Sequence, residues 1–380
     1  MKKIIITAIL VGVFLLCSPV ILYAQEDTNL LEDNDLLENI DFTDAELVLD
    51  DVLGEDISFE QMVRDLIKGK MPFNKDTFIS LAKKAFLEEI ENNWDSMIYI
   101  LILAILASVF TNFTKVFEKS QVADISFYII YLLLLAILIK SFCVVNSVAE
   151  TILAQMTEFM KVLMPTYFLT VAVSNGGTTA VVFYEFLLFL IYGINWVLLK
   201  ILLPVCNIYV VLSLVNYISQ EDLLSRMADL LKQLVGWGLK TLLAVVIGLN
   251  AIQGLIAPAV DSFKSGVLHK TVSAIPGVGN TMNAVTEVVI GSSVLIKNSV
   301  GAGILIVLAI LSMIPLLKLF VFMFLYKLTA AVIQPIADKR MVQCISTVGE
   351  GARLLMRCVS TAVVLFFITI AILTVSTNIR

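Results

Sequence analysis

The chain has 380 residues, of which 59% are hydrophobic and 15% are charged, and its mean hydropathy is +0.94. Soluble domains carry about 25% charged residues, so this composition excludes a soluble globular protein and predicts an all-α, polytopic helical membrane protein. The net charge of -6 is unevenly distributed, because the segment from Glu26 to Glu60 contains fourteen acidic residues and no basic ones. The remainder of the chain is therefore mildly basic.

Residues 1–24 have the pattern of a signal peptide. Lys2 and Lys3 form a basic head, Ile4 to Leu16 form an apolar core, and Leu22-Tyr23-Ala24 is a suitable cleavage site. An uncleaved membrane anchor is the alternative interpretation. Both interpretations place the acidic segment that follows outside the cytoplasm.

Residues 25–95 are expected to form this short exported segment, which is acidic and helical. Thr43 and Ser58 each begin a capping box, the pattern in which a polar residue and a Glu or Gln three positions later start a helix. A longer amphipathic helix is predicted over residues 75–92. These helices either cap the membrane domain of their own chain or bind a partner.

Residues 96–380 are expected to form the membrane domain, because several runs approach the roughly 20 apolar residues that cross a bilayer. About eight spans are predicted, and six or seven result if neighbouring runs join. The predicted spans lie at about 97–113, 125–145, 160–174, 180–199, 201–218, 234–256, 300–326 and 354–376.

Two basic segments orient these spans. Lys115 and Lys119 follow the first span, and a second group extends from Lys327 to Arg357. Because basic residues concentrate in cytoplasmic loops, both segments are expected on the cytoplasmic side. An exported N-terminus and an even number of crossings between the two segments satisfy this expectation.

Residues 257–299 interrupt the apolar pattern with Gly, Pro, Asn and Ser every few positions. Irregular backbone is tolerated at membrane depth only where protein or water covers it. We therefore predict a re-entrant or broken-helix element here, of the kind in which transporters place their binding sites. An amphipathic helix lying flat at the interface is the alternative. The candidate flexible positions are Pro258, Pro276, Gly277, Gly279 and Gly291.

Polar residues within or beside apolar runs are the candidate functional groups. A charge at the bilayer centre costs about 2.5–3.5 kcal/mol on insertion scales, so it normally faces protein or water. One hypothesis is that these groups line a polar pathway, and the other is that they pair between helices and fix the packing. The candidates are Glu185, Asn280, Asn283, Glu287 and Lys297.

The sequence does not indicate enzyme chemistry. His269 is the single histidine, and no HExxH, GxSxG or Walker A pattern accompanies it. We therefore expect a non-enzymatic protein that needs no metal or other cofactor and binds no nucleic acid. The cysteines that follow the signal peptide are expected to be small buried apolar residues. These are Cys143, Cys206, Cys344 and Cys358.

Several unusual strings resemble the stage III sporulation protein AE family, and the specific likeness covers about residues 160–345. The signal sequence, the acidic exported segment and the many spans also resemble the plan of that family. The strings are Met164–Thr170, Ser174–Thr178, Ala257–Ser262, Ala274–Asn280 and Gly291–Asn298.

This resemblance implies a place and a role. Proteins of the family act in the mother-cell-derived membrane around the forespore of endospore-forming bacteria. There they join other stage III sporulation membrane proteins and a forespore-membrane partner in a secretion-like channel that supports late forespore development. The family offers no catalytic residues to transfer. A homo-oligomer remains open, and the alternative function is a self-sufficient secondary transporter for a small solute.

Overall fold

Helices make up every regular element in the described part of the chain, as the composition predicts. The computed structural model describes residues 42–43, 46, 58–70, 75–116, 121–175, 177–217, 223–272 and 279–376. The predicted signal peptide and the first capping box therefore lie mostly outside the described residues. The prediction of an all-α, polytopic membrane protein is confirmed.

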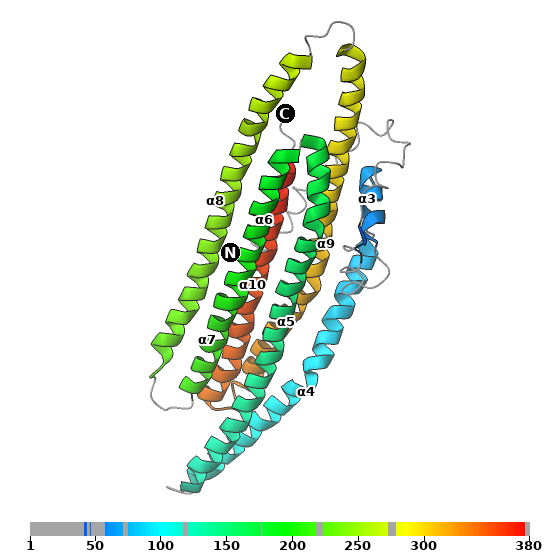
Figure 1. Cartoon of the computed structure of the whole chain (residues 1–380). Helices are drawn as coiled ribbons and strands as arrows, with labels where there is room; N and C mark the ends of the chain where they lie inside the picture. Colours follow the sequence, from blue (N-terminus) through cyan, green and yellow to red (C-terminus); the bar gives the residue numbers. More distant parts are fainter. Residues whose placement is uncertain are drawn as a thin grey trace.

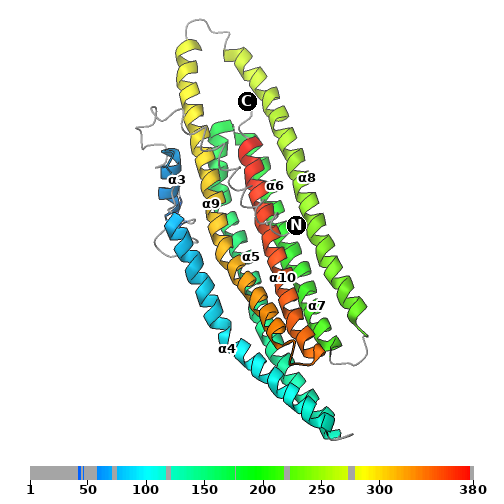
Figure 2. The ribbon, with the colours of Figure 1, turned by 180° about the vertical axis from the view of Figure 1, so that it is seen from behind.

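The helices form one elongated bundle, in which consecutive long helices run in opposite directions (Figure 1). Seen from behind, α8 and α5 stand on opposite sides of α10 (Figure 2). The helices are α3 (Phe59–Ile67), α4 (Lys75–Val116), α5 (Gln121–Asn175), α6 (Gly177–Val197), the π-helix η2 (Leu198–Leu202), α7 (Leu203–Asn216), α8 (Ser225–Val272), α9 (Gly279–Ile333) and α10 (Lys339–Ser376).

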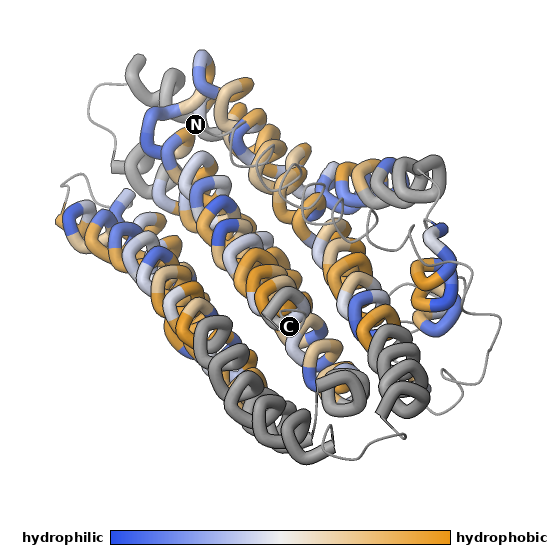
Figure 3. The backbone as a smooth tube through the Cα atoms, turned by 90° about the horizontal axis from the view of Figure 1, so that it is seen from above, coloured by the Kyte–Doolittle hydropathy of each residue, from blue (hydrophilic) through white to orange (hydrophobic). Residues whose placement is uncertain are grey.

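Five helical stretches in the described residues are long and apolar enough to cross a membrane. In the parts drawn in colour, hydrophobic residues recur along the long helices (Figure 3). The five stretches are Tyr128–Pro165, Phe186–Asn216, Ser225–Ile252, Val294–Ile333 and Lys339–Ile372.

The structure differs from the predicted division into eight spans, because neighbouring runs join into single helices. The runs at 125–145 and 160–174 both belong to α5. Polar side chains between them bond within the helix and do not end it: Thr157 Oγ1, for example, donates to the Leu153 carbonyl over 2.8 Å. Residues 75–92 likewise continue into the first predicted span as α4.

The runs at 180–199 and 201–218 are also joined, through the π-helix η2. Proline at position 204 has no N–H to donate, so an α-helical bond is missing at this point. The wider turn accommodates it, and the Leu203 N–H donates to the Leu198 carbonyl. A single helical column results, which agrees with the alternative in which neighbouring runs join.

Residues 257–299 lie mainly in two long helices. Residues 257–272 complete α8 and residues 279–299 begin α9. Pro258, one of the candidate flexible positions, does not end the helix, because α8 continues past it for more than three turns. The change of direction falls at residues 273–278, which lie outside the described residues. Both helices extend beyond α6 and α10 at this end (Figure 1).

Lys115, Lys339 and Arg340 lie towards the same end of the bundle, whereas Lys327, Arg353 and Arg357, which were expected in the same cytoplasmic segment, lie within α9 and α10. α4 and α9 end there and α10 begins there (Figure 1), which brings Lys115 close to the end that carries Lys339 and Arg340. Ser108 Oγ of α4 donates to the Ile336 carbonyl in the turn between α9 and α10 over 2.6 Å. Four helical columns separate the two segments along the chain, an even number, as the orientation argument requires.

The short helix α3 packs against the middle of α9. Ser58 caps it, because its side chain accepts from the Gln61 N–H over 3.3 Å, which confirms the second predicted cap. Phe59 and Val63 are fully buried, and a Cβ added at Gly303 of α9 would lie 3.3 Å from the Phe59 ring. The missing side chain at Gly303 therefore lets α3 approach α9.

Replacing Phe59 by alanine is expected to detach α3 from α9. Truncating a buried Phe costs about 3–5 kcal/mol, which exceeds what one short helix retains from its remaining contacts. Trypsin should then cleave faster after Lys68 or Lys70 in detergent-solubilised protein. Gln61→Ala, at an exposed position of the same helix, is the matched control and should leave the rate unchanged. Equal cleavage rates for both variants would contradict this packing role.

Candidate functional site

The sequence-predicted polar residues lie on α6 and α9. Glu185 lies in α6, and Asn280, Asn283 and Glu287 lie in the first turns of α9. The structure describes their backbone but not their side chains. The predicted pathway and the alternative of a structural pair therefore both stay predictions for these four residues.

The sequence-predicted flexible positions are distributed over the hairpin of α8 and α9. Pro258 lies within α8, as does His269, while Gly279 begins α9 and Gly291 lies within it. Pro276 and Gly277 fall outside the described residues.

Lys297, the remaining candidate, has a fully buried side chain. It lies on α9 one turn before Gly301, where three helices meet. Tyr167 OH of α5 lies 3.0 Å from Thr374 Oγ1 of α10, and a Cβ at Gly301 would lie 2.6 Å from that same Thr374 oxygen. Lys297 therefore lies beside a tight junction of α5, α9 and α10, to which Tyr167 of the string Met164–Thr170 contributes.

A partly exposed cluster of charges that the sequence analysis missed joins three helices of the bundle. Glu350 of α10 forms an ion pair with Lys327 of α9. Its Oε2 lies 3.6 Å from Lys232 Nζ of α8, and its Oε1 lies 2.9 Å from Arg353 Nη1 on its own helix. All four residues lie within candidate membrane spans. We call these four residues the Glu350 cluster.

A fourth helix completes the surroundings of this cluster. The Lys232 ammonium lies 5.9 Å from the centre of the Tyr209 ring on α7. Ammonium groups are attracted to the faces of aromatic rings, most strongly where water is scarce. The Glu350 carboxylate thus joins cations of α8, α9 and α10, and the Tyr209 ring joins this group to α7. With one carboxylate and three cations, the cluster carries a net positive charge.

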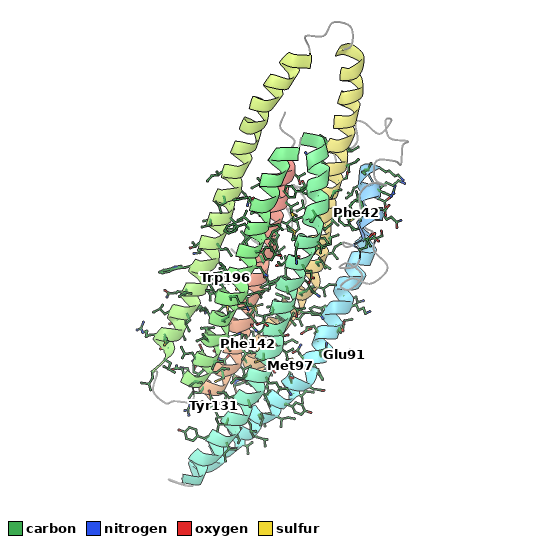
Figure 4. All side chains as sticks on the ribbon, viewed as in Figure 1. Phe42, Glu91, Met97, Tyr131, Phe142 and Trp196 are labelled. Atoms are coloured by element: carbon green, nitrogen blue, oxygen red, sulfur yellow. The ribbon has the colours of Figure 1, made fainter. Side chains whose placement is uncertain are left out.

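Glycines on both sides of Glu350 let α10 approach its neighbours. A Cβ at Gly349 would lie 3.0 Å from Lys327 Cγ and 3.3 Å from the Met323 carbonyl oxygen of α9. A Cβ at Gly351 would overlap Val210 of α7 and lie 2.7 Å from the Phe142 ring of α5, a residue marked on α5 in Figure 4. The sequence Gly349-Glu350-Gly351 therefore fixes both the packing and the charge pairing of α10.

The chemistry of the cluster is that of an electrostatic brace. A carboxylate surrounded by three cations is a poor general base, because its negative charge is already neutralised. No group of three or more His, Cys, Asp or Glu side chains in the described residues could hold a metal ion. The signal that could have revealed the cluster is Glu350 itself, the single acid of α10, which stands between two glycines.

The fold and this cluster define a multi-pass helical membrane protein whose bundle is braced by internal ion pairs. The family model for stage III sporulation protein AE matches residues 57–377. A relative described as stage III sporulation protein AE, from Bacillus subtilis (strain 168), is 23% identical over 319 residues, which cover 83% of this chain and 79% of its own. No solved structure matches the chain.

The chain belongs to the stage III sporulation protein AE family, as the resemblance predicted. The family match extends from α3 to the end of α10, well beyond the residues on which the resemblance was based. It therefore includes both the junction at Gly301 and the Glu350 cluster.

Replacing Gly351 by alanine should destabilise the bundle, because the new methyl group overlaps Val210 and Phe142. Overpacking of this kind costs about 1–3 kcal/mol. Adding Val210→Ala should recover part of the loss, and unfolding in detergent would measure both. Gly248→Ala is the matched control, because nothing lies within 4 Å of the added Cβ. A Gly351→Ala protein as stable as this control would refute the close packing.

Replacing Glu350 by glutamine should lower stability by about 2 kcal/mol, because it removes hydrogen bonds to charged groups and leaves three cations without their common partner. The midpoint of unfolding in detergent is the measurement. Glu91→Gln, at an exposed acid on α4, should have little effect. Adding Lys327→Met to Glu350→Gln should restore part of the stability, since it removes one uncompensated charge. If both single variants unfold at the same point, the cluster is not a brace.

Proposed function

We propose that this chain is a non-enzymatic, multi-pass membrane subunit of a sporulation-specific, secretion-like channel between mother cell and forespore, and that late forespore development requires it. The observation that carries the proposal is the family match, which spans the whole bundle from residue 57 to residue 377. Membership of a stage III sporulation family implies a sporulation role, and the membrane helices imply the bilayer as its site of action.

The length of the helices supports a role that extends beyond one bilayer. At about 1.5 Å per residue, α5 and α9 are each about 80 Å long, whereas the hydrocarbon core is only about 30 Å thick. The hairpin of α8 and α9 projects at the end opposite the basic turns (Figure 1). It could therefore reach a partner that lies outside the membrane.

The basic end supports an orientation for this projection. If the segments with Lys115 and Lys339 lie in the mother-cell cytoplasm, as positive residues near span ends usually do, the α8–α9 hairpin points into the space between the two membranes. The N-terminal segment then lies outside the cytoplasm as well, in the mother-cell-derived membrane around the forespore. Other stage III sporulation membrane proteins and a forespore-membrane partner are the expected binding partners.

The braced bundle favours a channel subunit over the alternative of a self-sufficient transporter. Alternating access requires one part of a transporter to move against another. The Glu350 cluster instead connects α7, α8, α9 and α10 through one carboxylate and one ring. Within the proposal, the subunit uses no cofactor, binds no nucleic acid, and takes any energy for transport from its partners.

The test uses sporulating cells that lack the chromosomal copy. A late forespore reporter should be lost, and both the wild-type chain and a His269→Ala variant should restore it, because the proposed role needs no imidazole chemistry. The tagged full-length chain should also co-purify with other stage III sporulation membrane proteins.

Three results would overturn the proposal. Normal reporter expression in the deletion strain would remove the sporulation requirement. Solute flux through liposomes containing only the purified chain would favour the transporter. Failure of the His269→Ala chain alone, at normal protein level, would reopen an enzymatic role.

A further inference from the structure

One face of α5 is polar although it lies on a helix long and apolar enough to cross a membrane. From Tyr128 to Ala136 the exposed residues of α5 are apolar or aromatic. Beyond them the exposed side chains of the same face are mainly small or charged, with Val144 and Pro165 as apolar exceptions. We call this set the α5 polar face: Lys140, Cys143, Ser147, Glu150, Thr151, Ala154, Glu158 and Lys161.

Contacts through α10 show that this polar face is level with an apolar surface on the opposite side of the bundle. Tyr167 of α5 contacts Thr374 of α10, and Asn250 of α8 donates to Thr369 Oγ1 of α10 over 3.2 Å. α5 and α10 run in the same direction (Figures 1 and 2). Lys161 lies six residues before Tyr167 on α5, and Thr369 lies five residues before Thr374 on α10. Lys161 is therefore nearly level with Thr369 and with Asn250, which contacts Thr369.

The outward face of α8 at that level is suited to lipid. Ile247 and Ile252, on either side of Asn250, are 39% and 56% exposed. Lys161 and Glu158, which lies one turn below it, are exposed at the same depth. An exposed charge in hydrocarbon costs several kcal/mol, so a polar cover suits this part of α5 better than lipid does.

The chemistry of the α5 polar face favours a protein helix as its cover. The face carries two lysines and two glutamates, so its charges balance. Cys143, Ser147 and Thr151 follow each other at intervals of four residues, and small residues at this spacing let two membrane helices pack closely. Cys143 was expected to be buried, and it is instead exposed, whereas Cys206, Cys344 and Cys358 are buried.

We propose that the α5 polar face is the surface through which two copies of this chain associate in the membrane. Two copies in one membrane share their orientation, so equivalent levels of α5 face each other. Glu158 of one copy then stands diagonally opposite Lys161 of the other, and the symmetric arrangement forms this pair twice. The small residues from Cys143 to Ala154 provide the close contact. This surface does not depend on the sporulation role proposed above.

The native Cys143 tests the proposal by crosslinking. Cys17, which lies in the predicted signal peptide, is first replaced by serine so that it cannot form a disulfide. This full-length chain is then examined in native membranes of sporulating cells under mild oxidation. A disulfide-linked dimer is expected, and Cys143→Ser should abolish it. Glu158→Lys should reduce the dimer several-fold, and adding Lys161→Glu should restore it, because the exchange recreates both pairs. A purely structural role of either residue would not give this restoration.

The matched control places a cysteine on the apolar side of the bundle. Val245→Cys, in the Cys143→Ser background, lies on the exposed face of α8 and should give no dimer. Two results would overturn the proposal. Labelling of Cys143 by a membrane-impermeant maleimide without crosslinking would mean that water covers this face. Protection of Cys143 without crosslinking would mean that lipid or another protein covers it.

Discussion

The close approach of α10 to its neighbours is the constraint on which the rest of the bundle depends. Because Gly349 and Gly351 have no side chains, α10 lies close to α9, α7 and α5, and a Cβ added at either position would crowd these helices. Glu350 lies between them and extends to cations on two neighbouring helices. If α10 stood farther out, the carboxylate would lose these partners within the membrane span, where an unpaired charge is costly. Close packing and ion pairing therefore support each other at one point of the fold.

The polar groups of this bundle differ in their surroundings and fall into three places. Lys297 and the Tyr167–Thr374 pair are buried at a junction of three helices, where hydrogen bonding fixes the packing. The Glu350 cluster is partly exposed and pairs one carboxylate with cations of neighbouring helices near the basic end. On α5, charged side chains are exposed at a level where α8 presents isoleucines. Polarity within the membrane region thus serves internal packing in the first two places and external association in the third.

Much of the fold could be predicted from the sequence, because composition and hydropathy depend on the bilayer alone. The helical class, the Ser58 cap and the shared end of Lys115 and Lys339 follow from such local signals. The joining of spans did not, because the polar stretch of α5 resembles a loop in a hydropathy pattern. Its side chains, such as Thr157, bond to their own helix and let it continue. The Glu350 cluster needs residues from α8, α9 and α10 together, and no local pattern predicts which charges a fold brings into contact.

The length of α9 also has a mechanical consequence. α9 is a single helix from Gly279 to Ile333, and Pro315 lies inside it. Proline removes one backbone hydrogen bond and so marks the place where a helix bends most easily. The residues of α9 that pack at Gly301 and Gly303 lie on one side of Pro315, and Lys327 of the Glu350 cluster lies on the other. A bend at Pro315 would therefore change the angle between the half of α9 that contacts α3 and the half that joins the cluster.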